Sequence, residues 1–268
     1  MTDAFGGIDV AFAKKKRLPV VVCVVVQGKL QPLPLRQLTK KPPAGRGNAK
    51  SIDDAEVDAF ASETADYLQA IEAYYSVRIR RVAIDAPSDP KRDGCKRRKY
   101  ECSLDERSIS CITTPSAGEF EDIRVKVSGH LAAGKPQSTI PHANQFWMLA
   151  GFALFRRLRR DWECLEVFPQ AITHALGANT THKKHSVGAF TQLAAAAKHT
   201  GWPGSSNAVK MAKELADIGF GQRHDRIDAY LSAWVASLEE QDREALGRSP
   251  DDVIWIPRLR SAGQAIVH

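Results

Sequence analysis

Three apolar segments follow one another in the first 36 residues of the chain, separated only by short turns. They span residues 6–13, 18–26 and 29–36, and the middle one is almost entirely valine, a residue that favours strands. Pro32 and Pro34 restrict the third segment to an edge or distorted strand, because proline cannot donate a hydrogen bond to a neighbouring strand. The chain is therefore predicted to begin with a three-stranded meander.

Helical and extended segments alternate along the remaining sequence. A helix is predicted over residues 51–75, a strand over 79–87, a helix over 142–159 and a strand over 162–169. Further helices and a last short strand or docked tail are expected at residues 170–176, 184–199, 206–217, 224–240 and 252–257. This order predicts one α/β domain, spanning the whole sequence, with a mixed five-stranded sheet and helices on both faces.

The segment 88–140 interrupts this alternation without a clean hydrophobic period. It holds basic charge, three cysteines and several glycines and prolines, and we interpret it as an insertion after the fourth strand that covers one end of the sheet. Cysteines and histidines in and just beyond it could build a zinc site, but their spacings lack the paired C-x-x-C signature, which favours ordinary loop or core cysteines. These residues are Cys95, Cys102, Cys111, His130 and His142.

The chain carries a formal net charge of +7, and its basic residues are clustered. The clusters lie at residues 13–17, 39–50, 90–100 and 156–160. Any one of them could be solvated surface, but four together indicate a polyanionic partner. No basic helix with a continuous apolar face accompanies them, so nucleic acid is expected and a membrane surface is not. The preferred phosphate contacts are Lys96, Arg97, Arg98, Lys99 and Arg107.

The valine run at residues 20–26 follows a basic stretch, as the apolar part of a signal peptide does. It is too short and too β-branched to span a membrane, and no small-residue cleavage site follows it. We therefore expect a cytoplasmic protein whose five cysteines are reduced.

Carboxylates stand inside or at the ends of several apolar segments. Asp9 lies within "GGIDVAFA", Asp85 ends "VAID", and Glu166 lies in "CLEVFP". Asp225 and Asp228 are three residues apart in "HDRIDAYLSAWVA", so on a helix their side chains are neighbours. An ionised carboxylate loses favourable hydration in apolar surroundings unless a positive group meets it. Because ligands of open α/β sheets bind outside the carboxyl ends of the strands, these acids are predicted to converge there.

Each acid also has a purely structural interpretation. Asp85 could cap a turn, Asp225 could cap the start of the last helix, and Glu166 could pair with an arginine. Several carboxylates at one end of a sheet would nevertheless repel one another. A divalent cation removes that repulsion, and Mg²⁺ binds carboxylates while it keeps waters and phosphate oxygens as further ligands. The sequence therefore predicts a Mg²⁺ or Mn²⁺ site built on these acids.

Several short motifs carry a resemblance to known families. They are "GIDVAFA", "VAIDAPSDP", "RKYECSLDERSISCITTPS", "CLEVFPQAI", "KKHSVGAFTQLAAAA" and "DRIDAYLSAWVA". Their order and spacing over residues 6–257 are similar to domain-of-unknown-function family 429, whose members are described mainly as predicted nucleases of RNase H-like fold. The predicted strand–helix order also resembles that of RNase H-like domains, and the closing "HDRIDA" segment resembles that of RuvC-type Holliday-junction resolvases.

The resemblance implies a nuclease that hydrolyses phosphodiester bonds by a mechanism with two Mg²⁺ or Mn²⁺ ions. Asp9, Asp85 and Asp228 would form the metal-binding core, with Asp225 and Glu166 as further ligands or supporting acids. The likeness to resolvases also implies a possible homodimer.

Two further positions follow from the same likeness. His224 could orient the attacking water or carry a proton, or it could be an ordinary residue at a helix start. RNase H proper also has a glutamate on its first helix, a place that Glu63 or Glu72 could fill here.

Three other functions compete with the nuclease. The first is a nucleic-acid-binding protein of the same fold that does not cut. The second is a phosphotransferase of the actin-like kind, which the absence of a G-x-x-x-x-G-K-[ST] loop disfavours. The third is a cysteine hydrolase, which is weakly supported because no ordered histidine partner is evident for any cysteine.

Overall fold

The computed structural model describes residues 1–178, 186–205, 207–248 and 252–259. Its main sheet has five strands in the order β3-β2-β1-β4-β5. The first three strands of the chain pair antiparallel, whereas β1 pairs parallel with β4 and β4 pairs parallel with β5. The predicted meander and the mixed five-stranded sheet are therefore confirmed. The strands of this sheet are β1 (Thr2–Asp9), β2 (Val20–Val26), β3 (Lys29–Pro32), β4 (Val77–Asp85) and β5 (Glu163–Glu166).

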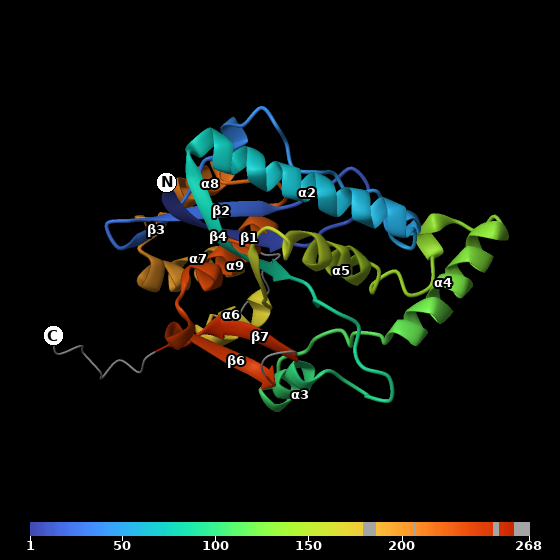
Figure 1. Ribbon diagram of the computed structural model, residues 1–268. Coiled ribbons are helices and arrows are strands. Elements are labelled where there is room, and N and C mark those ends of the chain that lie inside the picture. Colours follow the sequence, from blue (N-terminus) through green and yellow to red (C-terminus); the bar gives the residue numbers. More distant parts are fainter. Residues whose placement is uncertain (179–185, 206, 249–251, 260–268) are drawn as a thin grey trace.

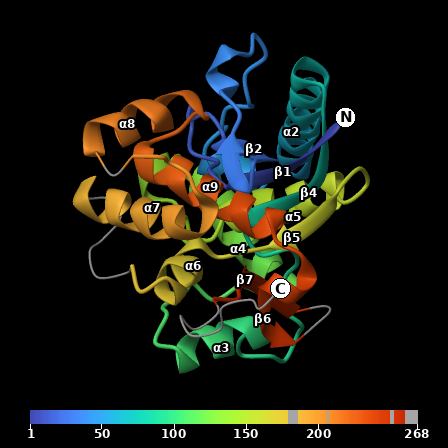
Figure 2. The same cartoon turned by 90° about the vertical axis from the view of Figure 1, so that its left-hand side faces the viewer.

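Helices cover both faces of this sheet, as predicted. Figure 2 shows α2 and α5 on one side of the strands and α7, α8 and α9 on the other. The helices are α1 (Asn48–Ser51), α2 (Asp54–Tyr75), α3 (Lys99–Glu106), α4 (Ala117–Ala132), α5 (Trp147–Leu158), α6 (Pro169–Ala175), α7 (Ser186–Thr200), α8 (Ala208–Asp217) and α9 (Arg223–Ser237). Short 3₁₀ turns are η1 (Leu35–Gln37), η2 (Gln137–Thr139) and η3 (Glu240–Asp242).

The valine run of β2 serves two cores at once. Val20, Val22 and Val24 pack in the core under α2 and α5, while Val21 and Cys23 pack in the core under α9. Because successive side chains of a strand point to opposite faces, a strand buried on both faces needs apolar residues without alternation. This double burial explains why the segment reads as a continuous apolar run.

Gly7 lets α9 lie directly on β1. A Cβ atom at Gly7 would lie 2.0 Å from the carbonyl oxygen of Ala229 and 2.3 Å from the backbone nitrogen of Ala233. Any larger residue at this position would therefore push the helix away from the strand. The glycine and the two alanines together set the distance between the helix and the sheet.

The first strand lies four residues earlier than predicted, at 2–9 and not 6–13. After Asp9, whose backbone N–H donates to the carbonyl of Pro19 at 3.1 Å, the chain leaves the sheet. Val10 and Phe12 are buried without belonging to a strand, and the Phe12 ring packs edge-on against Phe60 of α2. Their apolar character therefore reflects burial in a loop.

The end of the chain also differs from the prediction. The predicted helix over 224–240 stops at Ser237, where Arg81 donates hydrogen bonds to the carbonyls of Ala236 and Leu238. Residues 243–248 form the strand β6 (Arg243–Arg248), which pairs antiparallel with β7 (Asp252–Pro257). The sequence indicated only β7. Residues 184 and 185 of the predicted helix 184–199 lie outside the described residues.

The segment 88–140 is more regular than its sequence suggested, since it holds α3 and α4. Figure 1 shows α3 next to the β6–β7 hairpin and α4 on the far side of α5. Within the described ranges, no helix has the length and hydropathy that a membrane-spanning segment requires.

Candidate active site

Asp9 and Asp85 are the last residues of two adjacent parallel strands, and they are direct partners in the register of β1 with β4. Gly7 faces α9, so Asp9, two residues further along the strand, faces the same side. Asp85 shares this side because register partners in a parallel pair point the same way. The two carboxylates therefore stand side by side at the carboxyl end of the sheet, on adjacent strands about 4.8 Å apart.

α9 brings Asp228 to the same end of the sheet. The guanidinium of Arg81 donates a hydrogen bond to the carbonyl of Ala236, near the end of α9. Arg81 is also the register partner of Phe5, which lies in the first half of β1. The start of α9 must therefore lie toward the end of β1. Gly221, just before the helix, packs against Pro19, and the carbonyl of Pro19 bonds the backbone of Asp9.

Asp228 itself is only 2 % exposed and precedes the Ala229 carbonyl that approaches Gly7. The fold thus unites three of the predicted acids from distant parts of the sequence, Asp9, Asp85 and Asp228, at one end of the sheet. As their side chains are placed, no group of three or more possible metal ligands occurs in the part of the chain that the structure describes.

Asp225 helps to begin α9. One of its carboxylate oxygens accepts a hydrogen bond from the backbone N–H of Gln222 at 2.8 Å, in a capping box. The other lies 3.0 Å from Nε2 of His224, which is partly buried. Both oxygens are therefore engaged within the first turn of the helix. This arrangement corresponds to the structural interpretation of Asp225, in which it supports the helix start.

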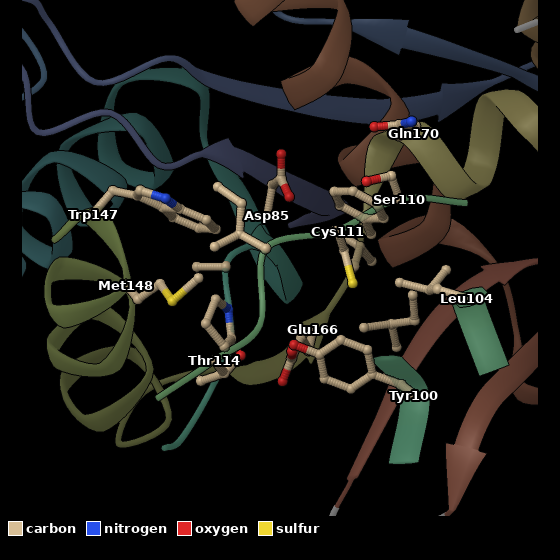
Figure 3. A pocket seen from close by; sticks show the side chains of 16 residues that line it. Asp85, Tyr100, Leu104, Ser110, Cys111, Thr114, Trp147, Met148, Glu166 and Gln170 are labelled. Carbon is tan, nitrogen blue, oxygen red and sulfur yellow. The ribbon is translucent and has the colours of Figure 1, made fainter. Parts of the chain in front are cut away.

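Glu166 points to the opposite face of the sheet. It is the register partner of Ile84, the residue before Asp85, so the alternation of side chains places Glu166 and Asp85 on different sides. The expectation that Glu166 joins the other acids as a ligand does not fit this placement. Figure 3 shows the two carboxylates on opposite sides of one cavity.

A positive partner does meet Glu166, and it is Arg98. The guanidinium donates two hydrogen bonds to the carboxylate, at 3.1 and 3.0 Å, and the backbone N–H of Ser88 donates a third at 2.9 Å. Burial raises the pKa of the Glu166 carboxyl, while the charge of Arg98 and the Ser88 hydrogen bond oppose the rise. Arg98 also binds Asp252 of β7 at 2.9 Å, so this buried network ties three distant segments together.

The basic residues chosen from the sequence divide into three groups. Arg98 is buried in the network just described, so the expectation that it contacts phosphate does not fit its position. Arg97 pairs with Asp105 and Arg107 pairs with Glu244, each at 2.6 Å. Lys96 and Lys99 are exposed and form no ion pair with any residue in the described ranges.

A polar cleft of about 690 Å³ adjoins this basic segment. Besides Arg97, Arg98 and Lys99, its lining includes Lys91, Arg92 and Arg248 as basic residues and Asp89 and Asp252 as acidic ones. Arg248 was missed from the sequence, because only the pairing of β6 with β7 brings it next to a segment so far away.

A second cavity, of about 290 Å³, opens at the ends of β4 and β5 and is mostly apolar (Figure 3). Asp85 forms part of its wall, which connects the cavity to the Asp9–Asp85 pair. Other parts of the wall come from the segment 88–140, which we expected to cover this end of the sheet, and from α5 and β7. No local pattern in the sequence indicates this cavity, because its walls come from five separate stretches.

Among the cysteines considered for zinc and the two glutamates considered on α2, only Cys111 lines this cavity. Cys95 and Cys102 are exposed, and the Cys111 sulfur accepts a hydrogen bond from Arg97 at 3.1 Å. None of these three cysteines belongs to a group of three possible metal ligands among the described residues. On α2, Glu63 pairs with Arg46 at 2.7 Å, and Glu72 accepts a hydrogen bond from the Ile79 backbone at the start of β4. Glu72 is therefore at the end of β4 away from Asp85.

Comparisons with known proteins gave no matching family model, no matching curated protein and no matching solved structure.

Proposed function

We propose that the chain is a metal-dependent nuclease of RNase H-like fold whose centre is the Asp9–Asp85 pair. The observation that carries the proposal is the register of β1 with β4, which sets two carboxylates side by side at the carboxyl end of a mixed sheet. The strand order β3-β2-β1-β4-β5, with an antiparallel meander followed by two parallel strands, supports the RNase H-like fold.

The donor chemistry of this pair suits Mg²⁺ or Mn²⁺, because both favour hard oxygen ligands. Mg²⁺ is commonly held by one or two carboxylates, with waters and substrate phosphates completing its shell, so two side chains are enough to hold one ion. Asp9 and Asp85 would hold it, and Asp228, the third acid at this end of the sheet, would help to hold a second ion. Such an ion, when bound, lowers the pKa of water and neutralises phosphate charge.

The chain's own residues would supply the rest of the reaction. The basic residues of the polar cleft, Arg92 and Lys99 among them, would hold the phosphate backbone without reading its sequence. His224 contacts the carboxylate of Asp225, which holds its ring near the start of α9, where it would orient the attacking water.

The test is cleavage of labelled single-stranded, duplex and branched DNA and RNA with Mg²⁺ or Mn²⁺. We expect products from the wild type and none from Asp9→Asn or Asp85→Asn, which keep the size of the side chain but remove its charge. Asp66→Asn, at an exposed acid on α2, is the matched control and should cut normally. Unchanged cleavage by Asp85→Asn would refute the assignment.

A second readout does not depend on activity. Mg²⁺ that binds the folded protein must raise its melting temperature, and this shift should disappear in Asp9→Asn.

A protein that binds nucleic acid without cutting is the second candidate, because the polar cleft does not require the carboxylate pair. Such a protein would bind nucleic acid as tightly in EDTA as in Mg²⁺, would lose affinity as the salt concentration rises, and would give no cleavage products.

A further inference from the structure

The apolar cavity beside Asp85 has the size and composition of a site for a small planar group. Its volume of about 290 Å³ is near the lower limit of ordinary ligand pockets, which begin at about 300 Å³. Trp147 and Met148 lie on one side of it, and Tyr100 and Leu104 lie on the other (Figure 3). The cavity therefore offers aromatic and apolar walls around a space much narrower than a duplex.

Trp147 is held in place before any ligand arrives. Its indole N–H donates to the carbonyl of Asn144 at 2.9 Å, and its side chain remains partly exposed at the cavity. A fixed and partly exposed aromatic ring is the kind of surface on which nucleobases stack, because every base presents a π face. Tyr100 is likewise fixed, since the guanidinium of Arg98 lies 4.4 Å from its ring centre.

One polar group in the wall is poorly satisfied. Thr114 is 1 % exposed, and its hydroxyl lies near the Tyr100 side chain but forms no hydrogen bond of good geometry with any of the described residues. A buried hydroxyl without a well-formed hydrogen bond destabilises the free protein, so such groups are rare unless a ligand or water completes them. The edge of a nucleobase carries both donors and acceptors and could satisfy a hydroxyl in either role.

We propose that this cavity receives one unpaired nucleobase of the substrate strand. The proposal rests on the proposed function and deepens it, because it names the substrate class as single-stranded or locally unpaired nucleic acid. A base in a duplex is stacked and paired, so it can enter such a pocket only after leaving the helix. Since Asp85 belongs both to the cavity wall and to the carboxylate pair, a base held there leaves its own sugar and phosphate next to Asp9 and Asp85.

Binding in EDTA separates this proposal from catalysis. We would measure the dissociation constant of a fluorescein-labelled thymidine oligonucleotide, and of an oligonucleotide of equal length built from abasic tetrahydrofuran units. Trp147→Ala should weaken binding of the first about tenfold and leave binding of the second unchanged. Trp147→Phe, which keeps a ring, should stay close to wild type. Tyr74→Ala, at an aromatic residue on α2 that is 59 % exposed, is the control and should bind both strands normally.

The comparison with the abasic strand guards against a folding artefact, because a damaged protein would lose affinity for both strands. The base pocket is overturned if Trp147→Ala binds the thymidine strand as tightly as the wild type does. If cleavage with Mg²⁺ persists in that case, the nuclease stands and only the pocket fails. If base-dependent binding is found and no strand is ever cut, the pocket stands and the nuclease fails.

Discussion

Asp9 and Asp85 end adjacent parallel strands in direct register, so their side chains leave the sheet together and on the same side. This relationship depends on backbone pairing alone. A slip of one residue in the register would send one carboxylate to the opposite face. The site is consequently only as well defined as the contact between β1 and β4, and anything that displaces β1 displaces the pair.

Gly7→Ala should be severely destabilising, because the new Cβ would meet the backbone of α9 at 2.0 and 2.3 Å. We expect a loss of more than about 3 kcal/mol in the free energy of unfolding, as for overpacking against backbone that cannot move aside. Urea denaturation measures it. Gly129→Ala, in an exposed part of α4 where a Cβ meets nothing within 4 Å, should raise stability by roughly 0.5–1 kcal/mol. Equal effects at the two sites would contradict the close packing.

Arg98→Met should cost about 3–5 kcal/mol at neutral pH, because it leaves the Glu166 carboxylate buried without its charge partner. The double variant with Glu166→Gln should recover much of this loss, since the amide still accepts the Ser88 N–H and carries no charge. Urea denaturation of the two single variants and the double variant tests the coupling. A double variant as unstable as the sum of its parts would show that the pair does not interact.

The cost of Arg98→Met should also depend on pH. Burial already raises the pKa of Glu166, and removal of the opposing charge raises it further. A carboxyl group whose pKa is raised in the folded state favours that state below its unfolded pKa, and this contribution is lost as pH rises through the folded pKa. The difference between the variant and the wild type should therefore shrink as the pH falls toward about 4.3, the usual pKa of glutamate, and be smallest below it. A penalty that is constant from pH 4 to 8 would argue against ionised Glu166 as its cause.

Asp225→Ala should lower the free energy of unfolding by about 1 kcal/mol, the usual cost of losing a helix cap. It should lower the rate of Mg²⁺-dependent cleavage only several-fold, because it releases the ring of His224 but removes no ligand of the proposed metal site. Asp228→Asn is the informative comparison, since Asp228 is the buried acid of α9 next to the carboxylate pair, and there we expect the cleavage rate to fall. If Asp225→Ala were as stable as the wild type but did not cleave, Asp225 would have to be counted as a ligand of the metal site.

Thr114→Val should leave the free protein as stable as the wild type or stabilise it by about 1 kcal/mol, because it removes a buried hydroxyl that lacks a hydrogen bond of good geometry. Thr64→Val is the matched control. The hydroxyl of Thr64 is also buried, but it donates to the carbonyl of Phe60 at 2.8 Å. That substitution should be neutral or destabilising by about 1 kcal/mol. Thermal unfolding of the two variants should therefore rank Thr114→Val above Thr64→Val.

The sequence predicted the sheet because its signals are local. Valine runs, glycine turns and prolines act within a few residues, and they marked all five strands and the helices α2, α5 and α9. The ends were less well predicted, as at Val10 and Phe12, because burial in a loop gives the same apolar pattern as burial in a strand.

The acids show the limit of this reasoning more clearly. Asp85 and Glu166 look alike in sequence, since each is a carboxylate in an apolar segment. Only the register of β4 with β5 reveals that they point to opposite faces. The partner of Glu166 was equally hidden, because Arg98 lies in a segment without periodicity and comes into contact only through the tertiary fold.

The contact of α9 with Gly7 has a consequence for the order of events during synthesis. The ribosome makes β1 first and α9 only after all five strands of the sheet have emerged. Until then the face of the sheet that bears Gly7 lacks its main covering helix, and a nascent chain exposes apolar surface there. Contacts between residues so far apart in sequence also form slowly, because a long loop must close first. Enclosure of the carboxylate pair is thus a late step in the folding of each newly made chain.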